Sequence, residues 1–169
     1  MPVADLQFDQ LVTEHYAMLY RFALSLTRNE TESLDLTQET FYLWATKGGQ
    51  LRDKSKVKTW LCTTLYREFL RGVRHLRRFP QVDICVVESE LPTVESETIG
   101  KMDAALVMEA LLELDEIHRA PLMLFYTDNR SYQEIADILD VAVGTVMSRL
   151  ARGKQQLRRH MAEKTSLGT

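Results

Sequence analysis

The stretch from Ser131 to Arg159 constrains the fold of this chain most strongly, because its pattern predicts two helices joined by a tight turn. Ser131 and Glu134 have the spacing of a capping box, which marks the start of a helix. Asp140 tolerates the left-handed backbone of a sharp turn and marks the end of the first helix. Apolar residues at helical spacing line one side of each helix: Tyr132, Ile135, Ala136 and Leu139, then Val143, Val146, Leu150 and Leu157. This pattern predicts a helix-turn-helix, whose second helix enters the major groove of DNA.

The second helix of this motif carries a polar and cationic face opposite its apolar side. The face is formed by Thr145, Ser148, Arg149, Arg152, Gln156 and Arg159. A row of arginines often marks only a solvated helix surface. Here hydroxyl and amide side chains accompany the arginines, and these types bond phosphates and base edges, which favours DNA binding. The same periodicity places Met147 toward the protein side, so we expect it to matter less.

Charge and composition divide the chain of 169 residues into parts. Lys and Arg outnumber Asp and Glu by 12 to 9 in residues 1–80, whereas the balance is 1 to 5 in 81–102 and 8 to 10 in 103–169. The acidic segment has no sustained helical period and contains prolines, as linkers do. We therefore expect an all-α chain of two small helical domains, at 1–79 and 101–169, joined by an acidic linker at 80–100.

Several classes of protein are disfavoured by the composition. The sequence has no apolar run of the roughly 20 residues that a membrane span needs and no secretion leader, which predicts a soluble, cytoplasmic protein without membrane insertion. Cys62 and Cys85 lack the spacing of a disulfide framework or a zinc site, so we expect them to be packing residues. We find no set of catalytic residues, phosphate loop or metal motif, and expect neither an enzyme nor a cofactor.

The N-terminal part predicts two helices. Apolar spacing from Phe8 to Leu26 predicts a helix of about six turns. The segment 33–46 is helical again, with apolar residues on both flanks of a narrow polar stripe. That stripe consists of Asp35, Gln38, Glu39 and Tyr42. It fits either a solvated ridge or a binding ridge for a basic partner, and spacing alone leaves both open.

A third helix is predicted from Val57 to Arg78. Leu61, Leu65, Phe69, Val73 and Leu76 lie on one face, and Trp60, Thr63, Arg67, Arg71, Arg74 and Arg78 lie on the other. An aromatic ring beside arginines suits unstacked bases and backbone phosphates together, as in single-strand recognition. Trp60 fits simple packing at a helix start equally well. The preceding loop, residues 47–56, is expected to be flexible and cationic.

These motifs together resemble bacterial RNA polymerase sigma factors of the extracytoplasmic-function (ECF) group of the sigma-70 family. The resemblance is carried by DLTQETF at 35–41, KTWLCTTLYREFLRGVRHLRR at 58–78, and HRAPLMLFY followed by SYQEIADILDVAVGTVMSRLARGKQQLR. It covers about residues 6–79 and 102–160. It implies a region 2 domain, a region 4 domain, and transcription initiation as the function.

The resemblance also implies partners for each surface. It assigns the Asp35, Gln38 and Glu39 ridge to the β′ clamp helices of core RNA polymerase, and the 47–56 loop with the third helix to the minus-ten non-template strand. The helix-turn-helix is assigned to the minus-thirty-five duplex, and helices at 102–114 and 116–127 to the β flap. We expect these two helices to show excess apolar surface, at Met102, Leu106, Val107, Met108, Leu111, Leu112 and Leu114. The family also makes an anti-sigma factor a plausible partner.

The chain departs from the family pattern at a few positions. Arg67 and Arg71 stand where the family commonly has Asn and Asp, which makes the promoter-melting helix more cationic. Met147 replaces a usual Lys, and Asp140 a frequent Gly. Two other classes stay open: a helix-turn-helix regulator that binds operators as a dimer without polymerase, and a helical adaptor or anti-sigma-like protein. The first leaves DLTQETF unexplained, and the second does not need the arginine face of 143–159.

Overall fold

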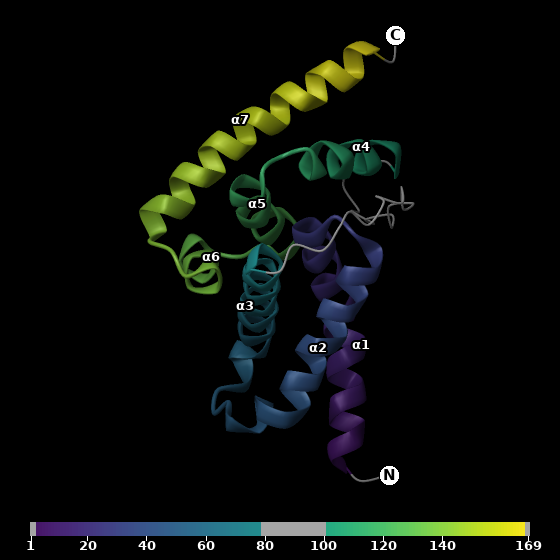
Figure 1. Ribbon diagram of the computed structural model, residues 1–169, viewed down its shortest axis with the longest axis vertical. Coiled ribbons are helices and arrows are strands. Elements are labelled where there is room, and N and C mark those ends of the chain that lie inside the picture. Colours follow the sequence, from purple (N-terminus) through teal and green to yellow (C-terminus); the bar gives the residue numbers. More distant parts are fainter. Residues whose placement is uncertain (1–2, 79–100, 168–169) are drawn as a thin grey trace. The chain divides into compact units, whose positions relative to one another are not determined.

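The computed structural model describes residues 3–78 and 101–167, and every regular element in these ranges is a helix (Figure 1). Two compact units are formed, one holding α1 to α3 and the other holding α4, α5, α7 and the first part of α6. Each is described on its own. The expected all-helical fold is confirmed, while the expected linker at 80–100, with Cys85, lies outside the described residues.

The first unit contains α1 (Val3–Thr27), α2 (Glu30–Lys47) and α3 (Val57–Arg78). The chain turns from α1 to α2 through Arg28, which has a left-handed backbone with φ 56°. The Asn29 side chain then accepts a hydrogen bond from the Glu32 amide at 3.0 Å, which caps the start of α2. Compared with the predicted ranges 8–26 and 33–46, the first two helices are longer, and the third has the predicted bounds.

The buried face of α2 is largely polar. The sequence places apolar residues on both flanks of the polar stripe, but the buried residues are Ser33, Thr37, Thr40 and Phe41, of which only Phe41 is apolar. The Thr37 hydroxyl donates to the Ser33 carbonyl at 2.7 Å, and the Thr40 hydroxyl donates to the Leu36 carbonyl at 2.8 Å. Because each hydroxyl bonds within its own helix, these residues can be buried without an unpaired polar group.

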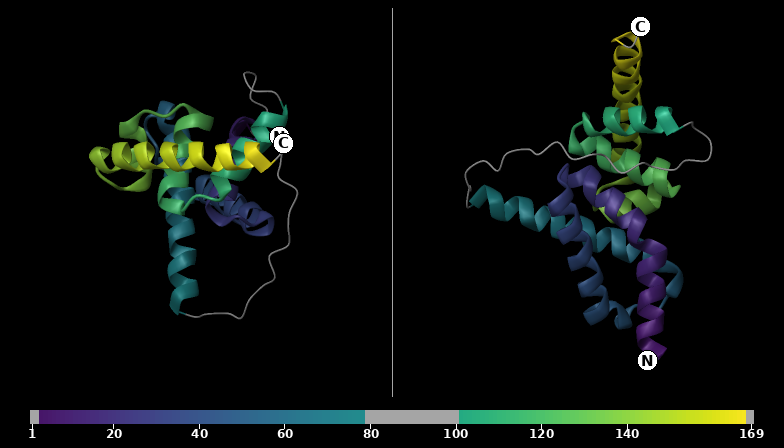
Figure 2. Two further views of the ribbon diagram at one scale, coloured as in Figure 1. Left: turned by 90° about the horizontal axis from the view of Figure 1, so that it is seen from above. Right: turned by 90° about the vertical axis from the view of Figure 1, so that its right-hand side faces the viewer.

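All three helices contribute to the core of the first unit, and Phe41 is the buried apolar residue of α2. Leu19, Phe22 and Ala23 of α1 are buried, as are Leu61 and Leu65 of α3. Packing ends before α3 does, since both views in Figure 2 show its C-terminal end extending beyond α1 and α2.

Two further expectations about α3 can be checked. Leu76, predicted to lie on the apolar face, is 53% exposed because it belongs to this extending end. Cys62 is buried and its sulfur lies 3.6 Å from that of Met18, consistent with the expected packing role.

The second unit contains α4 (Lys101–Leu112), α5 (Glu116–Asp128), residues 132–136 of α6 (Tyr132–Leu139) and α7 (Val143–Leu167). Helix α7 packs against both α4 and α5. It approaches α5 closely at Gly153, where an added Cβ would lie 2.8 Å from Cδ1 of Leu122. Near the C-terminal end of α7, Lys164 forms ion pairs with Glu113 at 2.8 Å and with Glu109 of α4 at 3.4 Å.

The apolar surface expected at 102–114 is only partly present, because Leu106, Val107 and Leu112 are half-buried. Met108, Leu111 and Leu114 are buried, and the large exposed apolar side chains of the next helix are Ile117 and Tyr126. The side chain of Met102 is not among those described. Helix α4 also ends earlier than predicted, and the buried Arg119 donates to the carbonyl oxygens of Leu112 and Leu114 just after its last turn.

Candidate nucleic-acid interface

The predicted capping box and turn are present at the two ends of α6. The Glu134 amide donates to the Ser131 hydroxyl at 3.2 Å, and the Ser131 amide donates to the Glu134 carboxylate at 2.9 Å. Asp140 has a left-handed backbone, with φ 53°. The Val141 amide then donates to the Ala136 carbonyl at 3.1 Å. These bonds close the end of α6 and set the direction in which α7 starts.

An ion-pair network around the buried Arg130, which the sequence pattern does not indicate, supports this start. Arg130 is 6% exposed, pairs with Asp128, and lies 3.3 Å from the Glu134 carboxylate. The pKa of Glu134 is held below its ordinary value of 4.5, mainly because its carboxylate accepts a hydrogen bond from the Ser131 amide. The hydrogen bond to the Ser131 hydroxyl and the nearby Arg130 charge lower this pKa further. The network joins the end of α5 to the first turn of α6.

The polar face of α7 is only partly as expected. Ser148, Arg152 and Arg159 are exposed, whereas Thr145, Arg149 and Gln156 are half-buried at its edge. The expectation for Met147 is wrong, because this side chain is 52% exposed. Ala151, Gln155 and Arg158 are exposed too, so the accessible face is turned from the predicted one and includes apolar positions.

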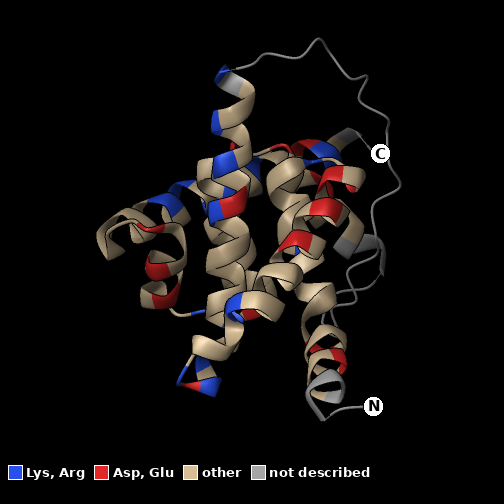
Figure 3. Ribbon diagram, turned by 60° about the horizontal axis from the view of Figure 1, so that its bottom comes forward, with Lys and Arg blue, Asp and Glu red and all other residues tan. Residues whose placement is uncertain are grey.

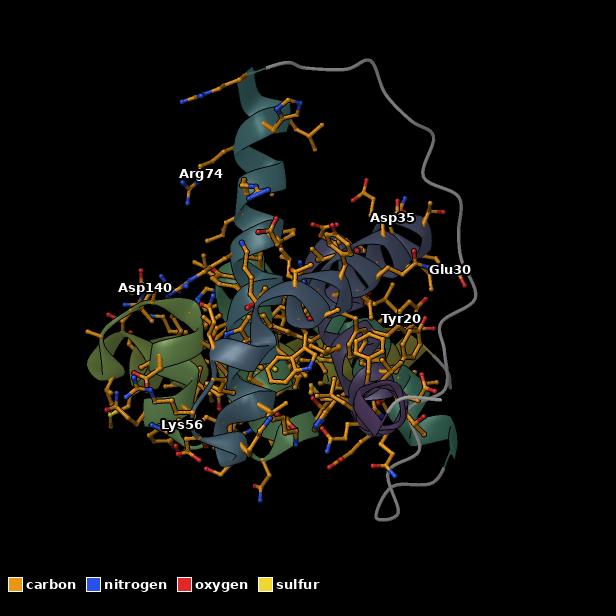
Figure 4. All side chains as sticks on the ribbon, turned by 90° about the horizontal axis from the view of Figure 1, so that it is seen from below. Tyr20, Glu30, Asp35, Lys56, Arg74 and Asp140 are labelled. Carbon is orange, nitrogen blue, oxygen red and sulfur yellow. The ribbon has the colours of Figure 1, made fainter. Side chains whose placement is uncertain are left out.

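The polar stripe of α2 is exposed along its length. Asp35, Gln38, Glu39 and Tyr42 are all exposed, and Tyr42 is 63% accessible. Asp35 points away from the ribbon in Figure 4. Since their hydrogen-bonding groups face solvent, these four residues form a surface that a partner can reach, called here the α2 ridge.

The cationic face of α3 is also present. Arg67, Arg71 and Arg74 are exposed, while Trp60 and Thr63 are half-buried near the start of the helix. Figure 3 shows Lys and Arg recurring along α3 toward its C-terminal end, and Arg74 projects from it in Figure 4. Arg71 lies 3.3 Å from the half-buried Glu68 of the preceding turn.

A hollow of about 300 Å³ opens at the N-terminal half of α3. Leu51 and Lys56 line it from the loop, and Trp60, Thr63 and Arg67 line it from α3. This volume is at the lower end of the range for small-ligand pockets, about 300–1,000 Å³. The hollow combines an aromatic ring, the hydroxyl groups of Thr59, Thr63 and Thr64, and two cations, which can stack on a base and bond its edge or phosphate.

The loop beside the hollow is more regular than expected. It contains two 3-10 turns, η1 (Gly48–Gln50) and η2 (Lys54–Lys56). The Asp53 carboxylate accepts hydrogen bonds from the Ser55 hydroxyl at 2.6 Å and the Ser55 amide at 3.0 Å. These bonds hold the pKa of Asp53 below its usual value and cap η2.

Within residues 3–78 and 101–167, no group of three or more His, Cys, Asp or Glu side chains is placed to hold a metal ion. None of the helices that the structure describes is both long enough and apolar enough to cross a membrane.

Comparison with known proteins covers both units. The family model for sigma-70 region 2 matches residues 11–79, and that for sigma-70 region 4 matches residues 104–157. The ECF RNA polymerase sigma factor SigE of Mycolicibacterium smegmatis is 34% identical over 94% of this chain, which spans 63% of that protein's length. SigL of Mycobacterium tuberculosis, also an ECF RNA polymerase sigma factor, is 31% identical over 90% of this chain and 88% of its own length.

Two solved structures share the fold of this chain. The sigma factor RpoE from Bartonella quintana, in complex with the anti-sigma factor NepR, gives a TM-score of 0.73 at 26% identity, covering 92% of this chain and 97% of RpoE. CnrH, in complex with the cytosolic domain of CnrY, shares the fold with a TM-score of 0.63 at 24% identity, over 92% of this chain and 88% of its own. The chain therefore belongs to the ECF group of the sigma-70 family, the non-enzymatic sigma factors that initiate transcription with RNA polymerase.

Proposed function

We propose that this sigma factor divides promoter recognition among three of its surfaces. The α2 ridge, formed by Asp35, Gln38, Glu39 and Tyr42, binds the β′ clamp helices of core RNA polymerase. The hollow and arginine face of α3, with Trp60, Thr63, Arg67, Arg71 and Arg74, bind the minus-ten non-template strand. The polar face of α7, with Thr145, Ser148, Arg149, Arg152 and Gln156, binds the minus-thirty-five duplex.

The observation that carries this proposal is the pairing of an aromatic ring with cations around one hollow. Trp60 lines the hollow beside Arg67, and Arg71 and Arg74 continue the exposed cationic face along α3. Stacking of a base on an aromatic side chain is worth roughly 1–3 kcal/mol and needs an unpaired strand. A helix with this composition is suited to holding a strand that has already separated from its complement.

Charge separates the two surfaces of the first unit. The α2 ridge carries two exposed carboxylates, and the α3 face carries three exposed guanidinium groups. Promoter DNA is repelled by the first and attracted by the second. The ridge is therefore left to a protein partner, which agrees with its proposed docking on core polymerase.

The second unit and the domain organisation complete the proposal. We assign α4 and α5 to the β flap, where Ile117 and Tyr126 supply exposed apolar contact surface. RpoE of Bartonella quintana binds the anti-sigma factor NepR, and we propose an anti-sigma factor as a partner of this chain as well. The domains are taken as 1–79 and 101–169 with a linker at 80–100, and the protein acts in the cytoplasm with promoter DNA.

The α2 ridge is tested by charge reversal. Asp35→Lys with Glu39→Lys should abolish binding to core polymerase in a pull-down, because both carboxylates are exposed and face the proposed partner. The melting temperature should stay nearly unchanged, since exposed substitutions usually alter stability by no more than about 0.5 kcal/mol.

The matched control makes the same charge change elsewhere on the first unit. Asp9→Lys with Glu14→Lys alters two exposed carboxylates of α1, and it should leave core binding intact. Undiminished binding by the ridge variant would contradict the docking proposal and favour a regulator that acts without polymerase. Loss of binding in both variants would mean that net charge, rather than the ridge, governs the association.

A further inference from the structure

We propose that Trp44 is a positioning residue for base capture: seated on Gly48, it fixes the Trp60 ring that lines the hollow. The inference rests on the proposed function of the hollow and names the device that sets its geometry. Trp44 belongs to the last turn of α2 and does not line the hollow itself.

The two indole rings contact one another directly. Their centroids are 5.1 Å apart and their planes meet at 75°, an edge-to-face arrangement. Aromatic pairs favour this geometry at centroid separations of about 4.5–7 Å, and it contributes roughly 0.5–1.5 kcal/mol beyond the area buried. Trp60 is therefore held from the side by a ring that comes from another helix.

Trp44 is in turn held by the chain that follows it. Gly48 is buried, and its amide donates to the Trp44 carbonyl at the end of α2. A Cβ at Gly48 would lie 2.6 Å from Cε3 and 2.7 Å from Cε2 of Trp44. The indole thus occupies the space that any other residue's side chain would need.

Glycine is required at position 48 by the space that the Trp44 ring occupies and not by the backbone conformation. Gly48 has φ −63° and ψ −25°, which is ordinary right-handed helical backbone that every residue adopts. An indole is rigid, so a Cβ here moves the whole ring rather than one flexible end. Displacing Trp44 then displaces the edge that rests on Trp60.

The chain offers a matched control in the next residue. Gly49 lies in the same 3-10 turn, has no positive φ, and an added Cβ there would meet no atom within 4 Å. Gly48→Ala and Gly49→Ala therefore make the same chemical change in the same turn. They differ in whether the new methyl group meets Trp44.

The experiment measures base capture by the holoenzyme formed from core polymerase and the full chain. Forked promoter DNA, obtained by selection from a random library, carries an abasic site at each minus-ten position in turn, and the affinity ratio of intact to abasic DNA reports capture of that base. We expect Gly48→Ala to lower the largest ratio by about tenfold, within the range that stacking on an aromatic ring supplies. Gly49→Ala should keep the ratio of the parent.

Two tryptophan variants separate positioning from stability and from the function of the hollow. Trp44→Leu removes the ring without adding a clash, and we expect it to lower the same ratio while the other minus-ten positions stay unaffected. Since Trp44 and Trp60 are the two tryptophans of the chain, near-ultraviolet circular dichroism reports their contact directly. Trp60→Ala tests the hollow itself.

The outcomes distinguish the inference from the function beneath it. A parent-like ratio in Trp44→Leu, or equal ratios in the two glycine variants, overturns the positioning role if Trp60→Ala lowers the ratio. If Trp60→Ala also keeps the parent ratio, the hollow does not capture a base and the proposed function of α3 fails first. A ratio lowered in Gly48→Ala, Trp44→Leu and Trp60→Ala at one shared position supports the proposal.

Discussion

At the scale of single residues, the exposed face of α7 carries an apolar strip that is unusual for a helix proposed to bind DNA. Met147 is 52% exposed, and Ala151, four residues later on the same side of the helix, is exposed as well. Apolar side chains read DNA by contacting the 5-methyl group of thymine in the major groove. Met147 is therefore suited to favour thymine at one position of the minus-thirty-five element.

Replacing that thymine by deoxyuridine, which lacks only the methyl group, tests this role. We expect the parent to bind the thymine duplex about fourfold better, since one buried methyl-sized group is worth about 0.8 kcal/mol. Met147→Ala should lose the preference and keep its melting temperature. Met161→Ala, at a half-buried position of the same helix, is the control and should keep the preference. An undiminished preference in Met147→Ala would show that the methyl group is read elsewhere or not at all.

The assignment of Met147 shows where residue-level prediction stops. Periodicity gives the direction of a side chain around its helix, and it correctly separated the buried Val146 and Leu150 from the exposed Arg152. Met147 lies between these directions. Its exposure depends on how much of the α7 surface the neighbouring helices cover, and the periodicity of α7 alone does not give this. Arg130 was missed for a related reason, since its burial depends on Asp128 and Glu134 together.

At the scale of elements, the two ends of α6 were easier to predict than the buried face of α2. The capping box at Ser131 and the left-handed turn at Asp140 were readable because both depend on residues within one turn. The core face of α2 was not, because Ser33, Thr37 and Thr40 look polar until their hydroxyls are seen to bond within the helix. Local bonds follow from sequence spacing, whereas burial requires knowledge of the partner helix.

The capping box also gives the second unit a dependence on pH. The pKa of Glu134 is lowered in the folded protein, so its stabilising effect is present above the ordinary value of 4.5 and is lost as the pH falls through the lowered pKa. Glu134→Gln keeps a hydrogen-bond acceptor but removes the charge. We expect this variant to be less stable than the parent at neutral pH, with the difference vanishing well below pH 4.5.

Urea unfolding followed by circular dichroism measures this difference. The control is Glu163→Gln, which changes an exposed glutamate near the C-terminal end of α7. This variant should differ little from the parent in stability at every pH. A difference between parent and Glu134→Gln that stays constant from neutral to acidic pH would mean that the charge of Glu134 does not contribute to folding.

At the scale of the whole molecule, the order of motifs along the chain predicted the family, and the two family models cover the segments in which those motifs lie. The sequence does not determine the residues that bind each partner in the same way, because a solvated helix face and a binding face have the same sequence pattern. The α2 ridge illustrates this, since its exposure agrees with both interpretations. Only measurements that separate the steps of initiation can assign each surface to its step.

Strand opening provides such a separation, because the proposed surfaces for duplex binding and for strand capture lie in different units. Arg67→Ala with Arg71→Ala should still form the closed promoter complex through α7 but should fail to open the minus-ten segment, as reported by permanganate reactivity of unpaired thymines. Arg67 lines the hollow, whereas Arg71 does not, so the single Arg67 variant should retain the larger part of the defect and the Arg71 variant should mainly reduce the salt dependence. On a promoter supplied already melted, the defect should shrink because the opening step is bypassed.

The control is Arg158→Ala, which changes an exposed arginine of α7 and should leave opening unaffected once the closed complex has formed. Equal permanganate reactivity in the parent and in the double variant would show that the arginines of α3 are only a solvated face.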